Sequence, residues 1–250
     1  MTFAVLRQVS GPARVKVLLA LLCGVTAWVL CACSGDGSPV SRPVQEPEPL
    51  APSADATLYE SSSGQLANGA GVSLYVGTTR QESERVRRAL VRFDLSELSA
   101  SCELIRSAQL RMTVTRSQGG ALQLSVYRVL TEWNEGSAGA GTADDGRGAP
   151  AGSGDATWLH TGSGSLWAMA GGDHDQSPAL QESISATTGV VTIQDATGGL
   201  RDLVQFWRDN PGQNFGALLL ADESLIGTVR RFQSRESGSS GAPQLVLQCS

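Results

Sequence analysis

Hydrophobic and polar positions alternate in short segments from residue 54 onward, and Gly, Ser and Asn interrupt the segments. Apolar residues at every second position indicate β-strands, because successive side chains of a strand point to opposite faces of its sheet. About nine such strands predict an all-β fold, a jelly-roll β-sandwich. The segments with this pattern, or with a continuous apolar run, are 55–61, 72–77, 87–95, 105–115, 121–130, 189–195, 215–221, 228–234 and 243–249.

One segment has the period of a helix instead. Leu200, Leu203, Val204 and Trp207 fall at positions i, i+3, i+4 and i+7, which is the spacing of one apolar helix face. Asn210 and the Pro-Gly that follows it predict where the helix stops. We therefore expect a single short amphipathic helix that covers an open end or edge of the sandwich.

Arginines occupy outward positions of the segment 87–95, and they allow two interpretations. Alternation places Ala89, Val91, Phe93 and Leu95 on one face, and Arg88, Leu90, Arg92 and Asp94 on the other. If charges of opposite sign meet across neighbouring strands, they compensate each other and are structural. We expect this of Arg92, Asp94, Arg235 and Glu236.

The arginines ahead of Ala89 are the better candidates for ligand binding, since the sequence offers them no obvious internal partner. They are Arg80, Arg85, Arg87 and Arg88. Guanidinium groups form strong hydrogen bonds with the acidic groups of uronates, sulfates or phosphates. This cluster therefore predicts a patch that binds acidic polysaccharide.

The first 53 residues differ from the rest of the chain. Residues 1–32 contain three cations and no acid, then an apolar run that is short for a membrane span, which is typical of a signal peptide. Residues 33–53 are rich in proline and are predicted to form an extended tether. The folded domain is predicted to cover 54–250.

The end of the apolar run, "LCAC", resembles the lipobox of bacterial lipoproteins, with Leu30 at position −3, Ala32 at −1 and Cys33 as the modified residue. The resemblance implies lipidation of Cys33 and attachment to the bacterial cell envelope. Ser34 resembles the pattern that directs lipoproteins to the outer membrane. Plain secretion with cleavage nearby is the alternative.

The net charge restricts the possible binding partners, and the cysteine content predicts a disulfide. The formal net charge is −5, and without the three cations of the first 32 residues it is −8, so nucleic acid is a poor partner. Cys102 and Cys249 are the two cysteines of the predicted domain. Because a leftover pair usually bonds in an oxidising compartment, we expect a disulfide between them, with two free thiols as the alternative.

Candidate chemistry is sparse, and we expect no enzyme activity, no metal and no cofactor. The chain has two histidines, His160 and His174, and none of the common hydrolase or metal motifs. Residues 134–156 are nearly all small or acidic and predict a long, mobile, solvated loop. Its carboxylates suggest calcium, but their spacing fits neither an EF-hand nor a nonapeptide repeat.

Tryptophans near this loop are candidates for sugar binding, because aromatic faces stack on sugar rings. Trp133, Trp158 and Trp167 are the candidates. A tryptophan is, however, more often part of the core or the rim of a sandwich than a platform for a sugar.

An ordered series of motifs resembles the DNRLRE-domain family over residues 54–248. The series includes "RRALVRFDLSEL", "IRSAQLRMTV", "VYRVLTEWNEG" and "LVQFWRDNPGQNFGALLL". The resemblance implies a jelly-roll module of exported surface proteins, some of which bind carbohydrate. The leading hypothesis is thus a lipid-anchored, non-catalytic structural or adhesive module, and the alternative is a carbohydrate-binding module for polysaccharide.

Overall fold

The computed structural model describes residues 48–141, 144–194, 196–238 and 240–250. The predicted signal peptide, Cys33 and most of the predicted tether lie outside these residues. Within them, no helix combines the length and the apolar character that a membrane crossing requires.

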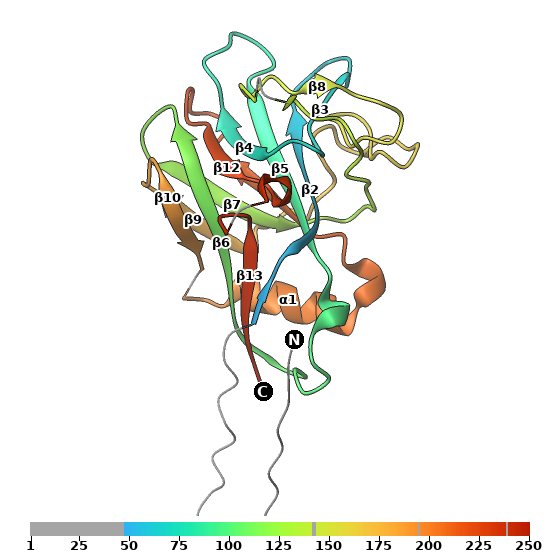
Figure 1. Ribbon diagram of the computed structural model, residues 1–250, viewed down its shortest axis with the longest axis vertical. Coiled ribbons are helices and arrows are strands. Elements are labelled where there is room, and N and C mark those ends of the chain that lie inside the picture. Colours follow the sequence, from blue (N-terminus) through green and yellow to red (C-terminus); the bar gives the residue numbers. More distant parts are fainter. Residues whose placement is uncertain (1–47, 142–143, 195, 239) are drawn as a thin grey trace, which may run out of the picture. The chain divides into compact units, whose positions relative to one another are not determined.

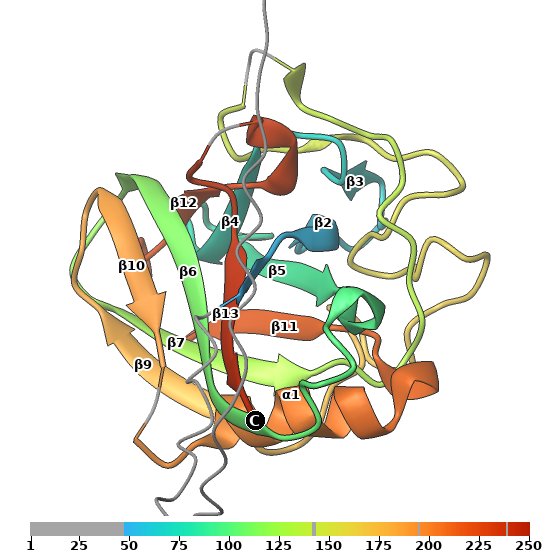
Figure 2. The same cartoon turned by 60° about the horizontal axis from the view of Figure 1, so that its bottom comes forward.

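The all-β prediction is confirmed: antiparallel strands form one large curled sheet that folds into two layers (Figures 1 and 2). One layer contains β1 (Glu48–Leu50), β13 (Gln244–Cys249), β6 (Ile105–Ser117), β10 (Gly189–Ile193) and β12 (Arg230–Gln233). The other contains β2 (Pro52–Tyr59), β5 (Val86–Phe93), β11 (Ala217–Ala221), β7 (Leu122–Arg128) and β9 (Leu180–Ile184). Strand β4 (Ser73–Thr78) pairs with β12 and β5, so it joins the layers.

All nine segments that the sequence predicted as strands contain a strand, and four further strands appear in the described residues. Three of these are only two or three residues long: β1, β3 (Leu66–Ala67) and β8 (Ala149–Pro150). Strand β1 begins at Glu48, ahead of residue 54, where the folded domain was predicted to start. Pro49 lies in β1 at the end of the strand order, where a residue without an N–H is tolerated.

The main hydrophobic core lies between the two layers. It is built from the inward positions of β5, β6, β7, β11 and β13, as alternation predicts. Ala89, Val91 and Phe93 of β5 face this core, which confirms the assignment of that face.

The predicted helix is present as α1 (Gly199–Asp209), and it closes one end of the sandwich against β6 (Figure 1). Leu200, Leu203, Val204 and Trp207 are buried, as their spacing predicted. Gln205 accepts a hydrogen bond from the backbone N–H of Ile105 at 2.8 Å, so the helix also satisfies the start of β6.

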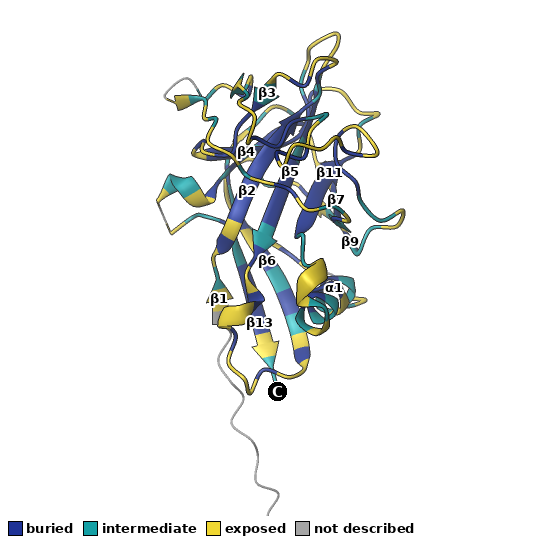
Figure 3. Cartoon of the chain, turned by 90° about the vertical axis from the view of Figure 1, so that its right-hand side faces the viewer, coloured by how far each residue is buried: buried dark blue, intermediate teal, exposed yellow. Residues whose placement is uncertain are grey.

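The segment 131–178, which we call the cover loop, has part of its described residues on the outer face of the second layer. Trp133, Ala156 and Trp167 of the cover loop form a second hydrophobic cluster with Leu90 of β5, Leu218 of β11 and neighbouring apolar residues of β2. These strands are therefore buried along most of their length (Figure 3). Most described residues of 134–156 are exposed or half-buried, as expected of a solvated loop, although Ala156 packs against the apolar sheet face.

Short polar contacts hold the cover loop, which has few apolar residues of its own. Asp155 accepts hydrogen bonds from the backbone N–H groups of Ser137, Ala138 and Gly152. Asp173 accepts hydrogen bonds from the backbone N–H groups of residues 168 and 169 and from the hydroxyl of Thr131. Carboxylates that accept several backbone N–H groups stabilise turns without a hydrophobic core.

The disulfide between Cys102 and Cys249 is confirmed. It connects the segment after the 3₁₀ helix η1 (Leu95–Glu97) to the end of β13, and Cys102 is fully buried. The two cysteines are 147 positions apart in the sequence. Because the crosslink closes so long a loop, it strongly restricts the unfolded chain.

We expect the double substitution Cys102→Ala and Cys249→Ala to lower the free energy of unfolding by about 2–5 kcal/mol. Urea unfolding of the oxidised protein and of the variant measures the difference. The reduced native protein serves as the control and should match the variant. Equal stability of the oxidised protein and the variant would contradict this account.

Candidate functional site

The arginines predicted to bind a ligand occupy four different environments. Arg80 is exposed and Arg85 is half-buried. Arg87 is buried, and its guanidinium donates to the carbonyls of Glu84, Val86 and Gly146 and lies over the ring of Tyr59. The expectation that these arginines lack internal partners is therefore wrong for Arg87.

Arg88 is also engaged inside the protein. Its guanidinium makes a two-pronged ion pair with Glu223, with N–O distances of 2.7 and 3.0 Å, and it lies 4.7 Å from the ring centroid of Trp158. A third donor bonds to the carbonyl of Gly171 in the cover loop. Arg88 thus fixes the loop to β5, and the expectation that it lacks an internal partner is also wrong.

Among the described residues, the charges predicted to pair across neighbouring strands do not do so, and the one ion pair between them joins two neighbours in the chain. Arg235 forms an ion pair with Glu236 at 2.9 Å. Arg92 lies over the ring of Trp133, 5.3 Å from its centroid, and among the described residues it has no ion pair with Asp94 or Glu236. Asp94 instead accepts the backbone N–H of Ser96 at the start of η1. Hydrogen bonds from Ser96, with a smaller contribution from the charge of Arg92, lower the pKa of Asp94.

Two of the three candidate tryptophans are buried and cannot present a face to a sugar ring. The indole N–H of Trp133 donates to the carbonyl of Phe215, and that of Trp167 donates to the carbonyl of Thr157. Only Trp158 is partly exposed. It borders an open cleft of about 510 Å³ together with Glu60, Glu84 and Leu159.

A second cleft, which we call the sheet groove, runs over the outer face of β7, β9 and β11 beside the cover loop. Its volume is about 530 Å³. Gln123 donates to the hydroxyl of Ser183, and Gln181 donates to the hydroxyl of Ser125, so amide and hydroxyl groups alternate between β7 and β9. The other lining residues are Leu124, Tyr127, Glu182, Leu220, Ala221, Asp222 and Glu223.

The sheet groove was not predicted, although the sequence contains the polar positions of one of its strands. Gln123, Ser125 and Tyr127 are the polar positions that alternate with the buried residues of β7. Strand β9 was missed because its five residues, LQESI, show only a weak alternation. The continuity of the groove depends on this missed strand.

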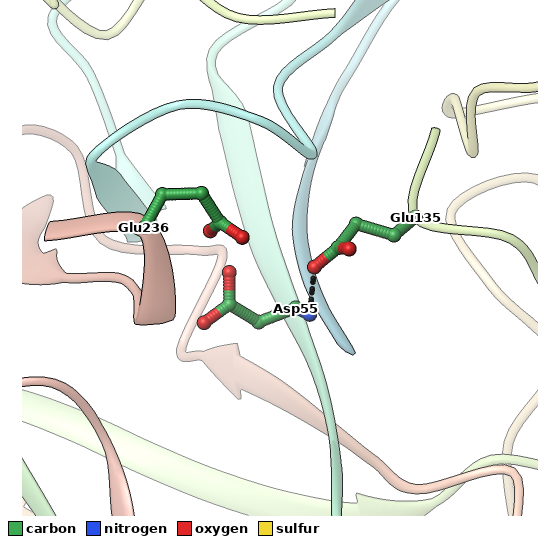
Figure 4. Close-up of side chains that lie close together, drawn as sticks. All are labelled: Asp55, Glu135 and Glu236. Atoms are coloured by element: carbon green, nitrogen blue, oxygen red, sulfur yellow. Dashed lines mark hydrogen bonds between the residues drawn. The ribbon is translucent and has the colours of Figure 1, made fainter. Parts of the chain in front are cut away.

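Three carboxylates from distant parts of the chain form a further cluster (Figure 4). Asp55 belongs to β2, Glu135 to the cover loop, and Glu236 to the 3₁₀ helix η4 (Arg235–Ser237). One carboxylate oxygen from each residue lies within 4.8 Å of the others. We call this group the carboxylate cluster. Nothing in the sequence indicated it, because its members are 80 and 101 positions apart.

Hydrogen bonds link the carboxylate cluster to its surroundings. The backbone N–H of Asp55 donates to Glu135 at 2.6 Å, and the backbone N–H of Arg235 donates to Asp55 at 2.8 Å. The guanidinium of Arg235 donates to both oxygens of Glu135. Asp55 is fully buried, whereas Glu135 and Glu236 are partly exposed.

This environment changes the acidity of the cluster. Burial raises the pKa of Asp55 from 3.8 to about 8, and the negative charges of Glu236 and Glu135 act in the same direction. The hydrogen bond from Arg235 opposes this effect. Burial, followed by the charge of Glu135, also raises the pKa of Glu236.

The comparison with protein families supports a carbohydrate-binding module family. The model of carbohydrate-binding module family 96 matches residues 46–157. This range includes β1 to β8, Asp55, Glu135 and the β7 side of the sheet groove, and it ends one residue before Trp158. No curated protein matches the chain.

We expect the free energy of unfolding to fall as the pH rises from about 4 to about 8. The folded protein retains the Asp55 proton up to about pH 8, whereas the unfolded chain releases it near pH 4, so rising pH favours the unfolded state. Urea unfolding between pH 5 and pH 9, with EDTA present, measures the slope. The variant Asp55→Asn should show a flatter profile, and an unchanged profile would refute the assignment to Asp55.

Proposed function

We propose that this chain is a non-catalytic carbohydrate-binding module that binds polysaccharide in the sheet groove. The match to carbohydrate-binding module family 96 carries this proposal. The earlier resemblance to the DNRLRE-domain family points to the same class of protein. The sheet groove is lined by amide and hydroxyl side chains, which form hydrogen bonds with sugar hydroxyls.

The chemistry of the sheet groove supports binding of a chain of hydroxyl groups. Gln123, Ser125, Gln181 and Ser183 offer donors and acceptors at the regular spacing of two paired strands. Tyr127 adds a partly exposed ring at one end, where it lies next to His174 with ring centroids 4.6 Å apart. An extended polysaccharide presents hydroxyl groups at a regular interval, and the paired strands present hydrogen-bonding side chains at a regular interval as well.

Charge in the sheet groove favours a neutral polysaccharide over an acidic one. Glu182, Asp222 and Glu223 line it, and no Lys or Arg does. Glu223 forms an ion pair with Arg88, which compensates its charge. Its carboxylate can therefore accept hydrogen bonds from sugar hydroxyls without adding a full negative charge to the groove. A uronate or sulfate would meet carboxylates there, which disfavours binding.

We expect the double variant Gln123→Ala with Gln181→Ala to bind a soluble neutral polysaccharide about tenfold more weakly, because each lost hydrogen bond contributes about 0.5–1.5 kcal/mol. Affinity electrophoresis in gels that contain a neutral β-glucan, a galactomannan or a polyuronate measures binding. The matched control, Gln213→Ala with Gln248→Ala, removes two exposed amides elsewhere and should bind normally.

Two results would contradict this site. Binding that is unchanged in the groove variant would place the ligand elsewhere on the module. Retention by the polyuronate alone, lost on substitution of the exposed Arg80 and the half-buried Arg85, would favour the arginine-based interpretation of the sequence.

We also propose that a lipid on Cys33 holds the module at the bacterial cell envelope, and that the membrane concerned is the outer membrane. The support is the sequence pattern alone: a basic segment, an apolar run and "LCAC" before a proline-rich tether. A module held in this way would keep a polysaccharide close to the membrane surface. Its structural or adhesive role would follow from that attachment.

Replacement of Cys33 by Ser should abolish incorporation of labelled fatty acid and move the protein from the membrane fraction to the soluble fraction. Metabolic labelling and fractionation of cells that express each form measure both effects. Replacement of Cys31 by Ser is the matched control and should leave labelling unchanged. Equal labelling of the native protein and the Cys33 variant would overturn the proposal.

A further inference from the structure

The carboxylate cluster contains two buried oxygen atoms that have no hydrogen-bond partner. They are Oδ1 of Asp55 and Oε2 of Glu236, and the carboxylates of these two residues face each other (Figure 4). Asp55 is fully buried, so water does not solvate its carboxylate. Buried polar atoms without a partner are costly, and they often mark the place of an ion or a proton.

The charges of the carboxylate cluster do not cancel among its described members. Asp55, Glu135 and Glu236 together carry three negative charges when ionised. Arg235 contributes one positive charge through its ion pairs with Glu135 and Glu236. A net charge of minus two therefore remains once Asp55 has lost its proton, and a divalent cation would neutralise this charge.

We propose that the carboxylate cluster is a binding site for a divalent cation of the Ca²⁺ type, which Asp55, Glu135 and Glu236 coordinate. The site is independent of the sheet groove and of the proposed function.

Ligand type and spacing favour Ca²⁺ among the common metal ions. All three ligands are carboxylate oxygens, which suit hard cations such as Ca²⁺ and Mg²⁺ and are poor partners for soft metals. Oxygens bound to one Ca²⁺ at about 2.3–2.6 Å lie up to about 5 Å apart, and the three oxygens lie within 4.8 Å of one another. Mg²⁺ requires shorter bonds and a more rigid octahedron.

The cation would join three segments that are distant in sequence. Asp55 lies in β2, Glu135 at the start of the cover loop, and Glu236 in η4, which follows β12. Metal binding would therefore fix the cover loop to both layers of the sandwich. Because a ligand that binds only the folded state stabilises that state, the cation should raise the melting temperature.

Calorimetric titration of the chelator-treated protein with CaCl₂ at pH 8 tests the proposal directly. We expect one Ca²⁺ ion to bind, and we expect the melting temperature to rise by roughly 5–10 °C at a Ca²⁺ concentration about a hundredfold above Kd. MgCl₂ at the same concentrations should bind more weakly. Absence of binding heat together with an unchanged melting temperature in CaCl₂ would overturn the proposal.

The variant Asp55→Asn removes one ligand charge while it preserves the size of the side chain. Its amide can donate to Glu236, so we expect the variant to fold without metal and to lose at least tenfold in Ca²⁺ affinity. Glu236→Gln should behave in the same way. Glu97→Gln, which changes an exposed carboxylate in η1, is the matched control and should bind Ca²⁺ normally.

Polysaccharide binding separates this proposal from the proposed function. Loss of Ca²⁺ binding in Asp55→Asn with intact polysaccharide binding would support two independent sites. Full Ca²⁺ affinity in both Asp55→Asn and Glu236→Gln would overturn the assignment of the ligands, whatever the polysaccharide result.

Discussion

Burial of an apolar sheet face under the cover loop is the constraint on which much of this structure depends. The second layer carries Leu58, Leu90 and Leu218 on its outer face, so this face must be covered. The cover loop meets the requirement with two buried tryptophans and with carboxylates that bind its own backbone N–H groups. A segment of mostly small residues can thus form a stable layer. A few large side chains bury apolar area, and hydrogen bonds from carboxylates to backbone N–H groups fix the conformation of its turns.

The same constraint explains the arginines of β5. Arg88 and Arg92 do point away from the main core, as alternation requires, but the outer face is not open to water. Their guanidinium groups lie over Trp158 and Trp133, where the flat cations interact favourably with the rings. The two positive charges therefore attach the cover loop to β5. The charged side chains that line the sheet groove are acidic.

The sequence predicted what depends on local pattern and missed what depends on distant contacts. Alternation located the nine principal strands, the i, i+3, i+4 and i+7 spacing located α1, and the count of cysteines predicted the disulfide. Alternation does not reveal whether the polar side of a strand faces water or a second layer, so Arg88 was expected to lack an internal partner although it lies against the cover loop. The carboxylate cluster and the sheet groove arise from pairs of segments that only the folded chain brings together.

The pairing of β1 with β13 has a mechanical consequence. A force transmitted through the N-terminal segment enters the fold at Glu48, which is paired with Leu247, two positions from the disulfide-bonded Cys249. Tension can peel away the three residues of β1, while the disulfide keeps β13 attached to Cys102 in the core. The load then passes along the chain to β2, which pairs with β5 from Pro52 to Tyr59, so the sandwich resists unravelling from this end.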